Sequence, residues 1–188
     1  MRIPINRLCD AFGYEYGLNE KNQVTIKTPD NAYFIEKEAS KVPERWEFAY
    51  AGDPEGWNSG AMSLVVSDGY MRCASLGTST DPIIMGVPGV GLDTAKYKKL
   101  EIRVRYKYDA EKPLVMQLFF ITDKSGNWSE DKSFRMRLQS VDSEGEWEVY
   151  AADLTGNEVW VGTVKQFRFD PFNAVGSMDV DYIRLLEE

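Results

Sequence analysis

The sequence predicts a mainly β protein in which a small helix–hairpin unit is followed by an antiparallel β-sandwich or barrel. Apolar and polar residues alternate along several short runs from residue 44 onward, which is typical of strands with one buried face. Turn-forming Gly, Pro, Asp and Asn residues separate these runs, and no long helical pattern competes with them. The 188 residues leave room for one domain of about 150 residues and a smaller unit.

The first segment, residues 1–30, predicts a short helix and then a β-hairpin. The apolar residues Ile5, Leu8, Cys9 and Phe12 follow helical spacing, and Gly13 can end the helix. The runs YEYGL and QVTIKT, on either side of the turn NEKN, predict two strands. A unit of this size cannot bury a core alone. We therefore expect it to pack on the second segment or on another chain, in which case the protein self-associates through it.

Short motifs in this segment resemble the second half of a copper amine oxidase N-terminal-like domain, as found in bacterial surface proteins. They are Ile3-Pro4-Ile5, the helix end Ala11-Phe12-Gly13 and the hairpin strand Val24-Thr25-Ile26. The resemblance implies no copper chemistry, and the sequence offers no histidine to bind copper. Residues 31–43 are polar and charged, and we interpret them as a connector.

The second segment, residues 44–188, supplies the predicted sandwich. Leu100, Ile102, Val104 and Tyr106 alternate with charged residues, and the runs 134–138 and 166–169 show the same period of two. The run 114–121 is apolar on both faces except at Gln117, which predicts a central strand.

Several motifs in this segment, taken in order, resemble those of jelly-roll, galactose-binding-like carbohydrate-binding modules. They are Trp46-Glu47-Phe48, Gly56-Trp57, Asp81-Pro82, Phe119-Phe120-Ile121-Thr122-Asp123, Trp128-Ser129-Glu130-Asp131, Trp147-Glu148-Val149-Tyr150, Trp160-Val161-Gly162, Arg168-Phe169-Asp170-Pro171 and Asp181-Tyr182-Ile183-Arg184-Leu185. The resemblance implies a non-catalytic accessory module that binds a polysaccharide or oligosaccharide in an extracellular or cell-envelope protein. It also implies one structural Ca²⁺, which many such modules hold.

Tryptophans are the first candidates for glycan contacts, because sugar rings lay their C–H faces on flat apolar surfaces. Trp128 lies in the polar run KSGNWSEDKS, and Trp57 follows Gly56 in a turn-rich stretch. We therefore expect the rings of Trp57 and Trp128 to face solvent. The alternative, for any single tryptophan, is that its ring caps the core. Trp46 and Trp147 occupy alternating strand positions and Trp160 a compact turn, so we assign these three to the core.

A second candidate feature is a polar sheet face rich in arginine and glutamine. The residues predicted to point away from the core, and thus to contact a glycan, are Arg103, Arg105, Gln117, Arg135 and Arg137, with Gln166 and Arg168 beside them. Guanidinium and amide groups could bind sugar hydroxyls or uronate carboxylates. The alternative is an ordinary solvated face whose cations pair with Asp and Glu.

Carboxylates suggest where a metal ion could bind. Asp181 alternates with Ile183 and Leu185, which predicts that it points inward and needs a cation or hydrogen bonds. Glu47, Asp53 and Asp181 could together supply oxygen ligands for Ca²⁺ if the first and last strands of the sandwich pair. A salt bridge to an arginine is the alternative.

Composition narrows the functional classes. A net charge of −8 without a basic run argues against binding to nucleic acid or anionic membranes. The sequence contains no stretch of about 18 apolar residues, so it predicts no membrane insertion. The lack of histidine excludes Ser–His and Cys–His catalysis, and no nucleophile elbow or nucleotide-binding loop is present. The sequence therefore predicts that the chain is not an enzyme.

Two other functions remain open. The chain could be a structural spacer or protein-interaction module of a surface-layer assembly, which the incomplete first unit favours. A glycoside-active enzyme is the second alternative and needs two carboxylates facing each other across a cleft. The opening residues MRIPINRLCD lack an apolar signal core. We expect any leader of a secreted parent protein to lie outside this sequence.

Overall fold

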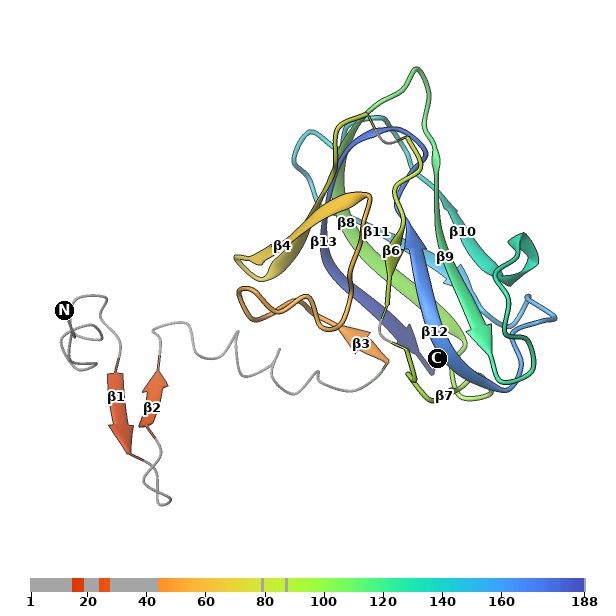
Figure 1. The fold of residues 1–188 in the computed structure, drawn as a ribbon, viewed down its shortest axis with the longest axis horizontal. Coiled ribbons are helices and arrows are strands. Elements are labelled where there is room, and N and C mark those ends of the chain that lie inside the picture. Colours follow the sequence, from red (N-terminus) through yellow and green to blue (C-terminus); the bar gives the residue numbers. More distant parts are fainter. Residues whose placement is uncertain (1–14, 19–23, 28–43, 79, 87, 188) are drawn as a thin grey trace. The chain divides into compact units, whose positions relative to one another are not determined.

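The computed structural model describes residues 15–18, 24–27, 44–78, 80–86 and 88–187. The chain divides into two compact units, Met1–Ala39 and Ser40–Glu188, which are described separately here. In the first unit, β1 (Glu15–Leu18) pairs with β2 (Val24–Lys27) in antiparallel register, which confirms the predicted hairpin (Figure 1). The predicted helix and the connector lie outside the described residues, as do the motifs Ile3-Pro4-Ile5 and Ala11-Phe12-Gly13.

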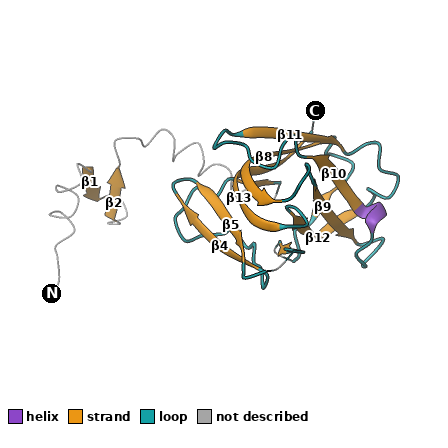
Figure 2. Ribbon diagram, turned by 90° about the horizontal axis from the view of Figure 1, so that it is seen from above, coloured by secondary structure: helices purple, strands orange, loops and turns teal. Residues whose placement is uncertain are grey.

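The second unit is a sandwich of two antiparallel sheets that lie face to face (Figures 1 and 2). The first, called the β8–β13 sheet, has the strand order β11 (Glu148–Asp153), β8 (Lys99–Asp109), β13 (Val175–Leu186), β5 (Tyr70–Ser75), β4 (Met62–Ser67), with β3 (Arg45–Trp46) also paired to β13. The second, called the β9–β12 sheet, has the order β10 (Ser133–Arg137), β9 (Val115–Thr122), β12 (Thr163–Asp170), β6 (Ile84–Met85), with β7 (Leu92–Asp93) also paired to β12.

These sheets confirm the mainly β prediction and the central position of the run around β9, which has β10 on one side and β12 on the other. The one helical turn in the described part of the chain is the 3-10 turn η1 (Glu130–Lys132) between β9 and β10. No described helix is long and apolar enough to cross a membrane.

The core fills the space between the sheets and follows the predicted period of two. On β8, Leu100, Ile102 and Val104 are fully buried while the residues between them are partly exposed. Trp46 and Trp160 are buried as predicted. Burial of apolar side chains from both sheets is the main stabilising term of such a sandwich.

Trp57 is also part of this core, so the prediction that its ring faces solvent was wrong. Its side chain is only 1 % exposed, and its ring meets that of Trp46 edge-on at a centroid distance of 5.4 Å. The cause is the tight turn before it, in which Gly56 has a φ of +86° and the Trp57 N–H bonds to the Pro54 carbonyl. The ring packs closely on Gly86, where a Cβ would lie 3.4 Å from the ring and 3.2 Å from the Phe167 carbonyl oxygen.

A β-bulge in β13 overturns the inward orientation predicted for Asp181. The pairing of β13 with β8 shifts register between Val180 and Tyr182. One extra residue therefore separates the buried Val180 from the buried Ile183, and Asp181 falls on the outer side of the sheet. Strict alternation counted back from the buried Ile183 places Asp181 on the inner face, and this is why the prediction from sequence was wrong.

The polar positions predicted to share one face occupy two. Arg103 and Arg105 lie on β8, whereas Gln117, Arg135 and Arg137 lie on β9 and β10. These strands belong to different sheets, so their outward side chains point to opposite sides of the sandwich. Alternation identifies which residues point outward but does not say which strands pair.

Candidate functional site

The outer face of the β8–β13 sheet carries a row of charged side chains across three neighbouring strands. Asp179 on β13 lies opposite Arg72 on β5 and opposite Arg105 on β8 in the strand register. Arg72 donates from Nε to Asp179 Oδ1 over 2.9 Å, and Arg105 donates from Nε to Asp179 Oδ2 over 2.8 Å. One carboxylate thus holds two guanidinium groups in place.

A second ion pair lies beside this row. Arg103, two residues before Arg105 on β8, donates from Nη1 to Asp181 Oδ2 over 2.8 Å. The bulge that turns Asp181 outward is what makes this pair possible. Both carboxylates are sheltered, with Asp179 and Asp181 each 9 % exposed. Hydrogen bonds to charged partners satisfy the polar groups that this partial burial removes from water.

Two aromatic rings lie over the charged row. Tyr70, at the start of β5, and Trp147, directly before β11, meet edge-on at a centroid distance of 5.6 Å. The Arg105 guanidinium lies 4.9 Å from the Tyr70 ring centroid and 4.7 Å from that of Trp147. Arg103 lies 5.3 Å from the Trp147 ring. These distances fit cation–π contacts, which fix the rings relative to the sheet.

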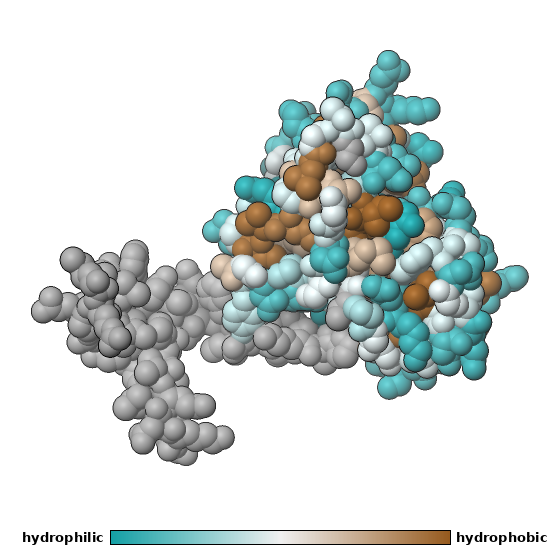
Figure 3. All heavy atoms as spheres, in the orientation of Figure 1, coloured by the Kyte–Doolittle hydropathy of each residue, from teal (hydrophilic) through white to brown (hydrophobic). Residues whose placement is uncertain are grey.

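We call this arrangement the platform; it comprises Tyr70, Arg72, Arg103, Arg105, Trp147, Asp179 and Asp181. Both of its rings are partly exposed. Apolar residues flank it on the neighbouring strands: Val65 of β4 pairs with Arg72, and Val149 of β11 pairs with Arg103. Val65 and Val149 are 55 % and 51 % exposed. Figure 3 shows hydrophobic atoms gathered on the surface over β4.

A shallow hollow adjoins the platform. It has a volume of about 420 Å³, and its lining includes Arg72, Arg105 and Asp179 together with Lys107 and Asp142. Lys107 and Asp142 form their own ion pair at 2.7 Å, next to the platform on the same strand face. That contact holds the pKa of Asp142 below its ordinary value, with a further contribution from the Glu144 N–H.

The residues predicted from sequence are therefore only partly brought together. Arg103 and Arg105 belong to the platform. On the opposite sheet, Gln117 and Arg135 share one acceptor, since the Gln117 amide donates to Glu130 Oε2 over 3.1 Å and Arg135 pairs with the same oxygen. Arg137 is exposed at the end of β10, which belongs to the sheet opposite the platform.

Trp128, the first candidate from sequence, lies partly exposed in the loop between β9 and η1. A buried lysine fixes this loop, because Lys132 donates from Nζ to the Asn127 carbonyl over 2.6 Å and to its side chain over 2.7 Å. The role predicted for Trp128 in glycan binding stays a prediction.

Sequence reasoning missed four platform residues, namely Tyr70, Arg72, Trp147 and Asp179. Trp147 was assigned to the core, but it is partly exposed and stacks over the arginines of β8. A signal was present in the run Tyr70-Met71-Arg72-Cys73, whose polar members alternate with the fully buried Met71 and Cys73. Asp179 alternates with the buried Met178 and Val180 in the same way.

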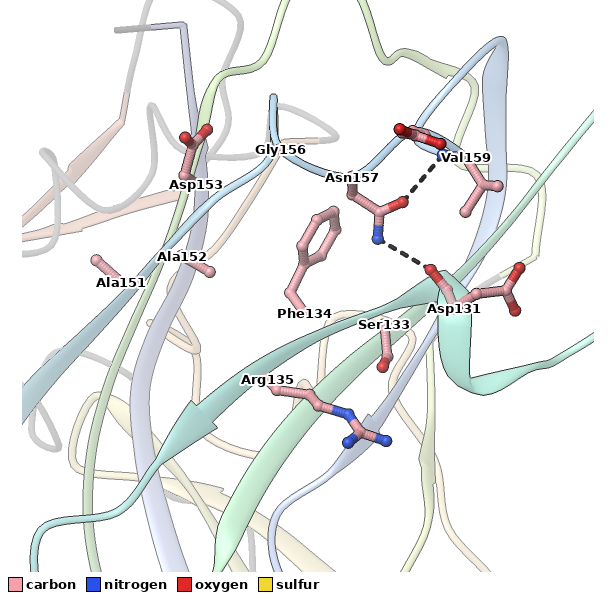
Figure 4. A pocket seen from close by; sticks show the side chains of 11 residues that line it. Asp131, Ser133, Phe134, Arg135, Ala151, Ala152, Asp153, Gly156, Asn157 and Val159 are labelled. Carbon is pink, nitrogen blue, oxygen red and sulfur yellow. Dashed lines mark hydrogen bonds between the residues drawn. The ribbon is translucent and has the colours of Figure 1, made fainter.

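A larger cleft lies between β10 and β11, the edge strands of the two sheets, with a volume of about 770 Å³ (Figure 4). The Asn157 side chain joins its walls by donating to the Asp131 carbonyl over 3.0 Å and accepting from the Val159 N–H. Its one aromatic lining residue, Phe134, is 4 % exposed and packs on Phe120. The cleft therefore offers no broad ring face to a ligand.

The carboxylates predicted to hold calcium do not form one site. Glu47 accepts two hydrogen bonds from Arg184, from Nε over 2.6 Å and from Nη2 over 2.8 Å, and Asp181 pairs with Arg103. Asp53 accepts from the Glu55 N–H. Among the described residues no three His, Cys, Asp or Glu side chains gather closely enough to hold a metal ion. Glu47 and Asp181 therefore fit the salt-bridge alternative better than a Ca²⁺ shell.

Comparisons with known proteins support the fold alone. No protein-family model and no curated protein sequence matches the chain. Among solved structures, BiXyn10A CBM1 in its apo form has a TM-score of 0.50 at 11 % identity, covering 78 % of this chain and 98 % of that one. Part of an exo-beta-agarase has a TM-score of 0.50 at 9 % identity, covering 70 % of this chain and 23 % of that one.

A family 6 carbohydrate-binding module is similar as well, with a TM-score of 0.45 at 9 % identity, covering 77 % of this chain and 93 % of that one. The predicted jelly-roll sandwich is the fold that this chain shares with BiXyn10A CBM1. At such low identity the likeness does not transfer a ligand or a binding residue.

Proposed function

We propose that this chain is a non-catalytic glycan-binding module that holds its ligand on the platform. The observation that supports this most is the pair of partly exposed rings, Tyr70 and Trp147, fixed over a network of three arginines and two aspartates. Such a surface offers both of the contacts that a sugar needs, a flat apolar face and charged hydrogen-bonding groups around it.

The network also prepares the surface for binding. Because Asp179 and Asp181 hold the guanidinium groups, the arginines lose little side-chain freedom when a ligand arrives. The same holds for Trp147, whose ring already rests against Arg103 and Arg105. The face is open and shallow, so we expect weak affinity for a single sugar unit and a gain from longer chains.

The carboxylates of the platform and of the cleft between β10 and β11 argue for binding rather than hydrolysis. On the platform, Asp179 and Asp181 are committed to arginines. In the cleft between β10 and β11, hydrogen bonds from Ser129 and from Thr155 hold the pKa values of Asp131 and Asp153 below their ordinary values. A general acid in glycoside hydrolysis needs a raised pKa. An accessory role in an extracellular or cell-surface protein is consistent with this proposal.

Isothermal titration calorimetry against a panel of neutral and acidic polysaccharides tests the proposal. The informative variants are Trp147→Ala and Trp128→Ala, which remove partly exposed tryptophans from the platform and from the β9–η1 loop. We expect Trp147→Ala to weaken binding about ten- to hundredfold, a loss similar to that caused by removing a ring that stacks on a nucleic-acid base. Trp128→Ala should bind as the wild type does. Thermal melting should show that both variants remain folded.

The reverse pattern would move the site to the loop that holds Trp128 and reject the platform. If the folded wild-type protein binds no polysaccharide in the panel, the glycan-binding proposal fails and the structural spacer becomes the better interpretation.

A further inference from the structure

The charges of the platform are unevenly exposed to solvent. The side chains of Arg72, Arg103 and Arg105 are 53 %, 38 % and 29 % exposed. Those of Asp179 and Asp181, which lie beneath them, are only 11 % and 12 % exposed. A ligand approaching this face therefore meets guanidinium groups before it meets carboxylates.

Hydrogen-bond capacity is unbalanced in the same direction. Asp179 accepts from both Arg72 and Arg105, so its two oxygens are already engaged. A guanidinium carries five N–H donors, whereas the hydrogen bonds of Arg105 and Arg103 in the structure use one nitrogen each, Nε and Nη1 respectively. The surface thus has spare donors and few spare acceptors.

The spare donors concentrate next to Trp147. On the Arg72 side, the exposed Asp68 adds negative charge and Tyr70 accepts a hydrogen bond from Nη2 over 2.7 Å. Among the described residues, no second acidic or hydroxyl partner is found for Arg103 or Arg105. Both guanidinium groups lie near the Trp147 ring, at 5.3 and 4.7 Å from its centroid. A planar acceptor with two oxygens fits a guanidinium by paired hydrogen bonds.

We propose that the platform is selective for an anionic polysaccharide, with a uronate carboxylate or a sulfate ester bound by Arg103 and Arg105 while the sugar ring lies against Trp147. This inference rests on the proposed function and adds the ligand class. The overall charge of −8 opposes the approach of every polyanion, nucleic acids and acidic glycans alike. Selectivity for an acidic glycan would therefore come from this local surplus of donors rather than from the field of the whole protein.

The test compares polymers that differ only in charge. Full-length protein is titrated calorimetrically with polygalacturonate and with the same polymer after methyl esterification, and separately with a sulfated galactan and its desulfated form. We expect one of the two charged polymers to bind about ten- to hundredfold more tightly than its neutralised form, the usual effect of a charge-assisted hydrogen bond. Whichever pair shows the difference identifies carboxylate or sulfate as the group bound.

Two variants locate the effect on β8. Arg105→Gln should remove the preference for the charged polymer. Lys107→Gln is the matched control, because Lys107 is the next outward cation on the same strand but pairs with Asp142 outside the platform. We expect Lys107→Gln to retain the preference. The comparison of polymers on the wild-type protein needs no variant, so the test survives even if Arg105→Gln fails to fold.

The outcomes separate this inference from the proposed function. Equal affinity for charged and neutral polymers, lost in both cases in Trp147→Ala, would overturn the selectivity and leave glycan binding in place. The selectivity would also be overturned if Lys107→Gln lost the preference for the charged polymer as fully as Arg105→Gln does, or if duplex DNA competed for the site. Either result would show a general attraction of polyanions. Failure of all polymers to bind would overturn both proposals.

Discussion

Asp179→Asn is expected to destabilise the sandwich measurably, although the residue lies on the outer face of a sheet. The substitution keeps the shape of the side chain and removes the charge that faces Arg72 and Arg105. Three contacts of 2.8–3.2 Å depend on this carboxylate. Without the Asp179 charge, the guanidinium groups of Arg72 and Arg105, on the two strands that flank β13, have no shared counterion.

The magnitude follows from the exposure of the partners. Exposed ion pairs are worth about 0.2–1 kcal/mol, and breaking a buried pair costs about 3–5 kcal/mol. Asp179 is sheltered at 11 % side-chain exposure while its two partners are 53 % and 29 % exposed. We therefore expect a loss of about 2 kcal/mol in the free energy of unfolding. For a domain of this size that corresponds to a fall of about 4–8 °C in Tm.

Thermal and urea denaturation measure this loss, and Asp142→Asn is the control. Asp142 also pairs with a cation on the same face, but its partner Lys107 is 77 % exposed. We expect that substitution to cost less than about 0.5 kcal/mol. Equal effects of Asp142→Asn and Asp179→Asn on the free energy of unfolding would refute the view that the platform is a fixed network.

Three further substitutions and one ion test other features. Gly176→Ala should cost about 3 kcal/mol or prevent folding, because a Cβ there would lie 2.5 Å from that of Tyr108; Gly60→Ala, with open space around it, should be neutral in the same denaturation assay. Trp57→Ala should lower the free energy of unfolding by about 3–5 kcal/mol, the cost of emptying a core site, and a near-neutral result would contradict its burial. Burial raises the pKa of Asp170 against the opposing effect of its arginine partner. Its contribution to stability is therefore present below about pH 4 and is lost as the pH rises through the raised pKa. Asp170→Asn should abolish this pH dependence of the free energy of unfolding. The prediction is refuted if urea melts give the same difference in unfolding free energy between wild type and variant throughout about pH 3 to 6. Two of the three carboxylates predicted for calcium, Glu47 and Asp181, are paired with arginines. Adding calcium or a chelator should therefore shift Tm by less than about 1 °C, whereas a clear rise with calcium would restore that prediction.

Much of the fold could be predicted from local patterns. The period of two in Leu100, Ile102 and Val104 identified β8 and its buried side, and the run 114–121, apolar except at Gln117, identified an interior strand. The hairpin of the first unit followed from two alternating runs around an Asn-rich turn. These features depend on residues close together in the chain, so a single sequence contains them.

The candidate site depends on long-range pairing, which a single sequence does not contain. Arg72 and Asp179 lie opposite each other although 107 positions separate them in the chain. Arg103 and Arg105 were identified as outward-facing, but their aromatic and acidic neighbours come from β5, β13 and the start of β11. The bulge in β13 then exchanged inward and outward positions at Asp181, which no counting of alternation could foresee.

The position of β13 within its sheet has a consequence for biosynthesis. This strand comes last in the described part of the chain, yet it lies in the interior of its sheet and pairs with β3, β5 and β8. During translation, the backbone N–H and C=O groups of the earlier strands that pair with β13 have no partner until residues 175–186 have left the ribosome. The sandwich therefore completes its fold only after residues 175–186 have been synthesised, and a nascent chain that lacks them would be a substrate for chaperones and proteases.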